Sequence, residues 1–402
     1  MRGTRRLTRH AVPSKLCRSQ HACRPGEGNR AMTISTQDGG LHFGCVAAPS
    51  GSGSGAATGS ARAEGGEAAA PRANPSVDIH AHYFPKRYFD VFNAEGRRFE
   101  AEFRADGETF SFKSPAGSVS GLPIKFIDLD RRLAEMDAQG VRVQALSLTT
   151  PMVYWADAAT SHALAAAWND GAIAAHKAHP DRFVVLATLP MLDRDRAIEE
   201  LDRVAELPGV RGVYMGTNIA GHDLDDSMFA PVIARIEALE LPIFLHPLQT
   251  IGGKRMGNFY LSNLLGNPID TAIAASRLIF GGVLDRHPRL QINLPHAGGA
   301  LPILIGRIDH GWKVRKENRH LEHAPSSYLR RFTYDTIAHS KPIMEFVISM
   351  VGADRIMLGS DYCFDMGYEQ PVGFLDQLDL SPADRKLILG QTAARLLKLD
   401  PA

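Results

Sequence analysis

The sequence has no excess of charge of either sign, few cysteines and no long apolar run. Its 402 residues carry a formal net charge of +1, which gives no electrostatic footprint for nucleic acid or an anionic membrane surface. No apolar run approaches the roughly 18 residues that a membrane-spanning helix needs, so we expect a soluble protein. No GxGxxG or P-loop pattern occurs, so no organic cofactor is implied. These absences favour a small molecule as the partner.

The cysteines are too few and too unevenly placed for a disulfide framework. There are four, and all except Cys363 lie in the first fifty residues. We therefore expect a reducing, cytoplasmic location. Hydrophobic residues make up 44 % and charged residues 22 % of the chain, which is typical of a globular protein with a large core.

Residues 1–75 differ in composition from the rest of the chain. Scattered arginines are followed by GSGSGAATGSARAEGGEAAAPRANP, which is rich in Gly, Ala and Ser. Such a segment buries too little apolar surface to offset its conformational entropy, so we expect a disordered tail. It lacks the apolar stretch of a secretory signal. A mis-assigned start explains this segment at least as well as a targeting peptide does, with Met32 as one candidate for the true start.

Residues 76–402 read as one domain in which strands alternate with helices. Apolar runs rich in β-branched residues alternate with segments of helical period, which include 127–139, 158–178, 193–207 and 226–240. We predict eight strands, at 77–82, 143–148, 183–190, 210–215, 242–246, 290–296, 332–336 and 356–361. This alternation predicts an α/β fold, a closed (β/α)8 TIM barrel. A doubly wound sheet is the alternative.

One segment interrupts the repeat. Residues 94–122, which include ETFSFKSPAGSVSGLP, separate the first predicted strand from its helix. We predict a small β-rich insertion, or lid, there. In a barrel this loop lies on the catalytic face.

Five residues able to bind a metal or to move protons lie at the carboxyl ends of predicted strands. They are His80 and His82 in VDIHAH, His246, His296 and Asp361. Residues i and i+2 of a strand point to one face about 6.6 Å apart, so both histidines of the HxH pair can turn toward one ion. Taken alone, each residue equally suits a structural role such as a helix cap or an Asx turn. Five unrelated structural roles at equivalent strand ends are improbable, so the set favours a metal site.

Three imidazoles and a carboxylate suit zinc, while iron, manganese and cobalt remain possible. A bound ion would lower the pKa of its water or polarise a substrate oxygen.

At this point the residues resemble the metal-dependent amidohydrolase superfamily, with its HxH on strand one, His on strands five and six, and Asp on strand eight. Longer runs resemble its branch of aminocarboxymuconate semialdehyde decarboxylase-like proteins. These runs are MDAQGVRVQALSLTTPMVYWA, RFVVLATLPM, RLIFGGVLDRHPRLQINLPHAGGALPILIGRIDHGW and DRIMLGSDYCFDMG. The resemblance extends from about Val77 to the C-terminus, and the run around His296 is its most specific part.

The resemblance implies roles for individual residues. The four ligands of one zinc ion and its water would be His80, His82, His246 and Asp361. His296 would be the acid/base, and Arg307 would bind the substrate carboxylate from the neighbouring subunit of a homodimer. A solvated helix residue is an equally good interpretation of Arg307.

Two comparisons with the superfamily narrow the prediction. Its two-metal members bridge their ions with a lysine or glutamate on strand four, which here reads VRGVYMG, so we expect one ion. The semialdehyde decarboxylases also carry a lid arginine and a tryptophan shortly after the strand-five histidine. Here Lys113 is the nearest lid cation, and Pro247, Leu248 and Gln249 follow the histidine. The substrate is therefore expected to differ from the namesake of that branch.

The leading hypothesis is a cytoplasmic, zinc-dependent decarboxylase of a small aromatic or muconate-like carboxylic acid, in which His296 and Asp361 handle protons. The alternative is a hydrolase of a lactone, ester or amide, or a hydratase, that uses the same site. A non-catalytic barrel that binds metal or a partner is the third hypothesis.

Overall fold

A computed structural model describes residues 41–44 and 75–399 of the chain. All of these belong to one compact unit, residues 33–402. Residues 1–75, which are predicted to be disordered, therefore lie almost wholly outside the described residues. Within this segment, the described residues 41–44 form the strand β1 (Leu41–Gly44), which pairs in parallel with β5 (Gly117–Pro123) of the insertion.

Eight parallel strands form the centre of the fold, and they neighbour one another in chain order. They are β2 (Val77–His82), β6 (Val143–Ser147), β7 (Phe183–Thr188), β8 (Val210–Gly216), β11 (Ile243–His246), β12 (Ile292–Leu294), β13 (Phe332–Asp335) and β14 (Ile356–Met357). Backbone hydrogen bonds then join the last strand segment to the first, from Ile79 N to Leu358 O (2.9 Å) and from Asp361 N to His80 O (2.9 Å). The predicted (β/α)8 barrel is confirmed, because a doubly wound sheet would reverse its strand order and leave β2 and β14 unjoined.

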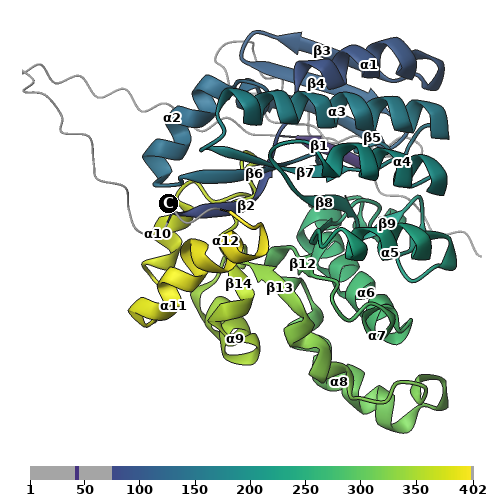
Figure 1. Cartoon of the computed structure of the whole chain (residues 1–402), viewed down its shortest axis with the longest axis vertical. Coiled ribbons are helices and arrows are strands. Elements are labelled where there is room, and N and C mark those ends of the chain that lie inside the picture. The colour runs from purple at the N-terminus through teal and green to yellow at the C-terminus, as the bar shows by residue number, and fades with distance from the viewer. Residues whose placement is uncertain (1–40, 45–74, 400–402) are drawn as a thin grey trace, which may run out of the picture. The chain divides into compact units, whose positions relative to one another are not determined.

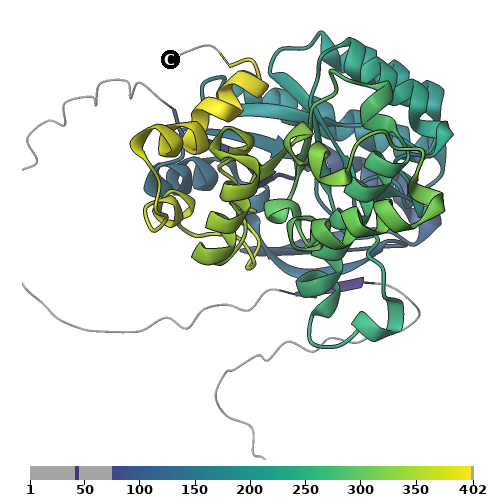
Figure 2. The ribbon, with the colours of Figure 1, turned by 90° about the horizontal axis from the view of Figure 1, so that it is seen from below.

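Helices surround the strands, as Figure 1 shows and as the view from below in Figure 2 repeats. Three of them begin at aspartates whose carboxylates accept backbone N–H bonds. Asp128 precedes α2 (Leu129–Gln139), Asp157 precedes α3 (Ala158–Ala178) and Asp193 precedes α4 (Arg194–Ala205). The others are α5 (Ala230–Ala238), α6 (Asn267–Phe280), α7 (Val283–Arg286), α8 (Leu301–Val314), α9 (Lys341–Val351), α10 (Pro371–Leu375), α11 (Pro382–Lys386) and α12 (Thr392–Leu396). Among the described residues, none of these helices combines the length and apolar character needed to cross a bilayer.

The predicted β-rich insertion is present after β2. Helix α1 (Lys86–Gly96) leads into an antiparallel sheet of β3 (Glu102–Asp106), β4 (Thr109–Ser114) and β5. A cluster of phenylalanines joins this sheet to the barrel, and the rings of Phe89 and Phe103 stack 3.8 Å apart. The buried side chains of Val119 and Leu122 then face the carboxyl ends of the barrel strands, where the candidate site lies.

Candidate metal and active site

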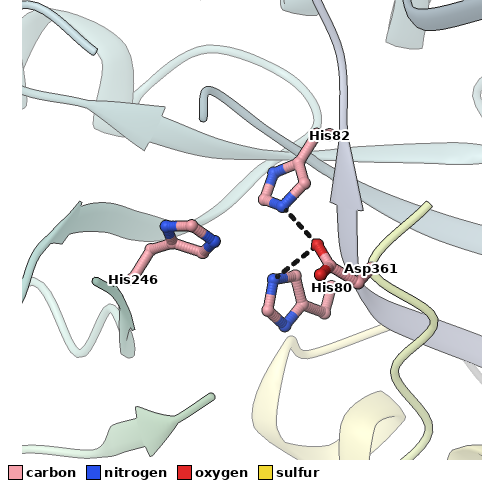
Figure 3. Close-up of side chains that lie close together, drawn as sticks. All are labelled: His80, His82, His246 and Asp361. Atoms are coloured by element: carbon pink, nitrogen blue, oxygen red, sulfur yellow. Dashed lines mark hydrogen bonds and ion pairs between the residues drawn. The ribbon is translucent and has the colours of Figure 1, made fainter. Parts of the chain in front are cut away.

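Four of the predicted site residues come together at the carboxyl ends of the barrel strands. His80 and His82 lie on β2, His246 ends β11, and Asp361 lies in the loop after β14. One side-chain atom of each lies within 4.8 Å of the corresponding atoms of the others, and all four residues are buried. Figure 3 shows His80, His82 and Asp361 in contact, with the ring of His246 turned toward them from the opposite side.

The contacts within this group leave room for a shared ligand. Nε2 of His82 lies 2.9 Å from Oδ1 of Asp361, and Nε2 of His80 lies 3.5 Å from the same oxygen. Nε2 of His80 is buried and forms no hydrogen bond. Buried polar atoms without a partner are rare, so this nitrogen is placed for a bond to something bound here. Three imidazole nitrogens and one carboxylate oxygen are a donor set that fits a single zinc or other first-row transition ion.

The protonation states of His82, His246 and Asp361 suit metal binding. Burial lowers the pKa of His82 to about 4 and holds the pKa of His246 well below its usual value, so both rings are neutral near pH 7. Nδ1 of His246 donates to the carbonyl oxygen of Pro247 at 2.8 Å, which leaves Nε2 as the free ligand atom. Burial alone would raise the pKa of Asp361, but the nearby His296 and His82 hold it well below the usual value. The carboxylate is therefore ionised.

Asp335, at the end of β13, supports the group from behind. Its Oδ2 lies 2.8 Å from Nδ1 of His80 and accepts the backbone N–H of His296 at 2.9 Å. Its Oδ1 accepts the N–H groups of Ala297 at 2.8 Å and Ile337 at 3.0 Å. A carboxylate on the second nitrogen of a ligand histidine orients that ring. Asp335 was not among the predicted site residues. It nevertheless lies near the end of the predicted strand 332–336, the kind of position at which the other candidates were found.

His296 lies next to the group but not on a strand. The predicted strand 290–296 is too long, because β12 ends at Leu294 and Pro295 has no N–H for the ladder. His296 and Ala297 then adopt left-handed backbone, with φ values of 55° and 53°. Nε2 of His296 lies 3.8 Å from Oδ2 of Asp361, and its buried Nδ1 forms no hydrogen bond.

Asp361 likewise lies beyond its predicted strand. The prediction for 356–361 is too long as a strand, since β14 ends at Met357. The backbone continues beside β2 as far as Tyr362 and makes a local left-handed turn at Asp361, where φ is 59°. That turn directs the carboxylate at the histidines of the first strand.

Two other predicted residues lie outside the site of this chain. Arg307 is exposed on α8, and the structure does not bring it to the four ligands. Lys113 on β4 is 60 % exposed and lies 3.6 Å from Glu100. It does not line the site.

A cavity of about 570 Å³, here called the site cavity, opens beside His246, His296 and Asp361. The insertion contributes two apolar side chains, and the loops after the strands contribute neutral polar ones. Of the loop residues 252–263, Tyr260 and Asn263 line it, whereas Arg255 and Asn258 are exposed and do not. The full lining is Val119, Leu122, Thr149, Thr150, His246, Pro247, Leu248, Tyr260, Asn263, Asn267, His296, Asp361 and Phe364.

Comparison with known proteins finds decarboxylases among the relatives of this chain. A 2-amino-3-carboxymuconate-6-semialdehyde decarboxylase from Dictyostelium discoideum is 30 % identical over 340 residues, which cover 81 % of this chain and 92 % of that protein. A gamma-resorcylate decarboxylase from a Rhizobium species is 30 % identical over 318 residues, which cover 73 % of this chain and 95 % of that protein.

A solved structure and a family profile complete the comparison. The crystal structure of a dihydroxybenzoic acid decarboxylase from a Polaromonas species, with bound manganese and the inhibitor 2-nitroresorcinol, superposes with a TM-score of 0.68. It is 26 % identical and covers 82 % of this chain and 98 % of its own. These relatives are decarboxylases of the amidohydrolase superfamily. The family described as Amidohydrolase matches residues 77–399. The chain therefore belongs to the amidohydrolase family.

Proposed function

We propose that this protein is a metal-dependent decarboxylase of a small aromatic or muconate-like carboxylic acid. One observation carries the proposal: His80, His82, His246 and Asp361 converge to within 4.8 Å beside a cavity that His296 also lines. The decarboxylase activities of the Dictyostelium, Rhizobium and Polaromonas relatives support the choice of reaction.

The ion that we propose is a single zinc ion held by the four converging residues. When bound, it would polarise the substrate and lower the pKa of a coordinated water. The donor set also accepts manganese, which the Polaromonas relative binds. Loading the purified protein with each metal in turn and measuring affinity decides between them.

His296 and Asp361 are the residues that we assign to proton transfer. When a carbon–carbon bond to a carboxylate breaks, CO₂ leaves and the remaining carbon must take a proton. Nε2 of His296 lies 3.8 Å from Oδ2 of Asp361, so the two groups face the same part of the site. Val119 and Leu122 of the insertion, together with Phe364, limit the access of water to this point.

The assembly that we propose is a homodimer in the cytoplasm. Helix α8 exposes Ile303 (61 %) and Leu304 (39 %) close to Arg307 along the chain. An apolar patch of this kind is typical of a protein interface. In a dimer, Arg307 of one copy would bind the substrate carboxylate in the site of the other. The buried, unpaired Cys363 is compatible with a reducing compartment.

The decisive experiment offers the metal-loaded protein a panel of hydroxybenzoates and muconates and follows CO₂ release. We expect release from at least one compound. Turnover of lactones, esters or amides without any CO₂ would replace the decarboxylase with the hydrolase alternative.

A further inference from the structure

In the described part of the chain, the space available to a substrate is lined by hydroxyls and amides rather than by lysine or arginine side chains. The site cavity has a neighbour of about 870 Å³, here called the second cavity, and the two share Asn263, Asn267, His296 and Asp361. Among the described residues that line either cavity there is no lysine and no arginine. Apart from the metal and proton-transfer groups, the polar side chains facing the site cavity are hydroxyls and amides, including those of Thr149 and Thr150.

Asn263 and Asn267 stand where the two cavities meet. Asn263 belongs to the π-helical turn η5 (Ser262–Gly266), and Asn267 begins α6 directly after it. Residues four apart in a helix share one face, so both amides are presented together. Both residues are half-buried, and π turns are frequent at functional sites.

Two cations lie over the ring of Tyr362, the neighbour of Asp361 in the chain, and both are engaged elsewhere. Arg132 is fully buried behind β2, where Nη1 donates to Gln144 Oε1 at 3.0 Å and Nη2 donates to the carbonyl oxygen of His82. Nζ of Lys125 lies 3.1 Å from Oε2 of Glu135. Neither side chain lines the site cavity, so neither is placed to neutralise a substrate there.

We propose that the substrate is an aromatic acid with a single carboxylate and neutral hydrogen-bonding ring substituents such as hydroxyls, and that Asn263 and Asn267 select it. This inference rests on the proposed function and names its substrate class. An amide offers both donors and an acceptor, so it pairs with a phenolic hydroxyl in either role.

The same lining disfavours a second carboxylate. A carboxylate that leaves water without a cationic partner loses its hydration and gains too little in return. The proposed ion, and Arg307 of a second copy, would serve the carboxylate that is lost as CO₂. A further carboxylate on the ring would have only neutral groups to face.

A matched pair of ligands tests this inference without relying on turnover. The compounds 2,3-dihydroxybenzoate and 2-hydroxybenzene-1,3-dicarboxylate differ only by a hydroxyl or a carboxylate at ring position 3. We expect the protein loaded with one equivalent of Mn²⁺ to bind the monocarboxylate tighter, by about tenfold or more, in isothermal titration calorimetry.

Substitutions of the amides complete the test. Asn263→Lys adds a cation to the cavity lining and should reduce the preference for the monocarboxylate by about tenfold. Asn267→Lys tests the same point from α6 if the first variant does not fold. Asn258→Lys is the matched control, because Asn258 is exposed on the same loop and does not line the cavity. The control should keep the wild-type preference.

Several results would overturn the inference. They are equal or tighter binding of the dicarboxylate, binding of neither compound, or an unchanged preference in a folded lysine variant. These results concern the substrate class alone and do not bear on the proposed decarboxylation. Absence of CO₂ release from every acid of the wider panel would instead defeat the proposed function.

Discussion

A single oxygen of Asp335 contacts both His80 and His296. Oδ2 of Asp335 lies 2.8 Å from Nδ1 of His80 and 2.9 Å from the backbone nitrogen of His296. Asp335 is fully buried, and burial would raise its pKa, but the hydrogen bond from His80 lowers it below the usual value. One ionised carboxylate therefore orients a proposed metal ligand and the turn that carries the proposed acid/base.

Asp335→Asn should weaken metal binding by about 10- to 100-fold, because an amide orients the ligand ring less well and cannot accept all of these bonds. Titration of the metal-free protein with Zn²⁺ or Mn²⁺ measures the effect. Asp379→Asn is the control, since Asp379 is 86 % exposed. Wild-type affinity in a folded Asp335→Asn protein would show that Asp335 does not act on the metal site.

Removing a ligand should remove the ion and the activity together. His80→Ala or Asp361→Ala takes away one of four donors, and three donors hold a transition ion less tightly than four. Elemental analysis of the purified variants, beside assays of CO₂ release, checks both effects. His310→Ala, at an exposed position of α8, should change neither. Near-full metal content and activity after either ligand substitution would refute the ligand assignment.

The contribution of His296 to activity should be separable from metal binding. His296→Asn removes the imidazole while keeping a residue type that tolerates left-handed backbone, which the φ of 55° requires. We expect activity to fall about 10²- to 10⁴-fold with the metal content unchanged. Loss of the metal in this variant would assign His296 to the ligand set instead.

Gly299 should be needed for the turn that follows His296. Its φ is 59°, and a Cβ added there would lie 2.3 Å from the carbonyl oxygen of Pro268. Gly299→Ala should lower the free energy of unfolding by about 1–3 kcal/mol, measured by urea denaturation. Gly306→Ala is the matched control, because a Cβ there meets open space within α8. In a helix interior that change should stabilise by up to about 1 kcal/mol.

A shared active site should be detectable by complementation. Mixed and reassembled, Arg307→Ala and His296→Asn chains form one intact site in each mixed dimer if Arg307 acts across the interface. About a quarter of the wild-type activity should return, because half of the dimers are mixed and each has one intact site of two. No recovery from chains shown to exchange would place Arg307 outside the catalytic unit.

The fold was readable from the sequence because each strand carried its own signal. VDIHAH and the helix 158–178 occupy the predicted residues, β2 and α3, since a buried apolar run and an Asp157 N-cap are local features. The ends of β12 and β14 were misplaced because the regular strands stop at Leu294 and Met357, before the left-handed turns at His296 and Asp361. Those turns depend on partners distant in sequence, such as Asp335 for His296.

The candidate site was only partly readable for the same reason. The four proposed ligands stand at strand ends, where position alone suggests convergence. Asn263 and Asn267 lie in a helical stretch without a strand signal, and their place beside the cavity depends on the π turn of η5. No local pattern distinguishes such amides from surface residues.

The seam between β2 and the segment after β14 has a consequence for assembly of the protein. His80 and His82 belong to the first barrel strand, whereas Asp361 comes from the segment that closes the barrel. During synthesis from the N-terminus, the histidine ligands exist long before the carboxylate does. Full coordination therefore waits for the last strand to dock, and a bound ion would clasp the two ends of the barrel as well as serve the reaction.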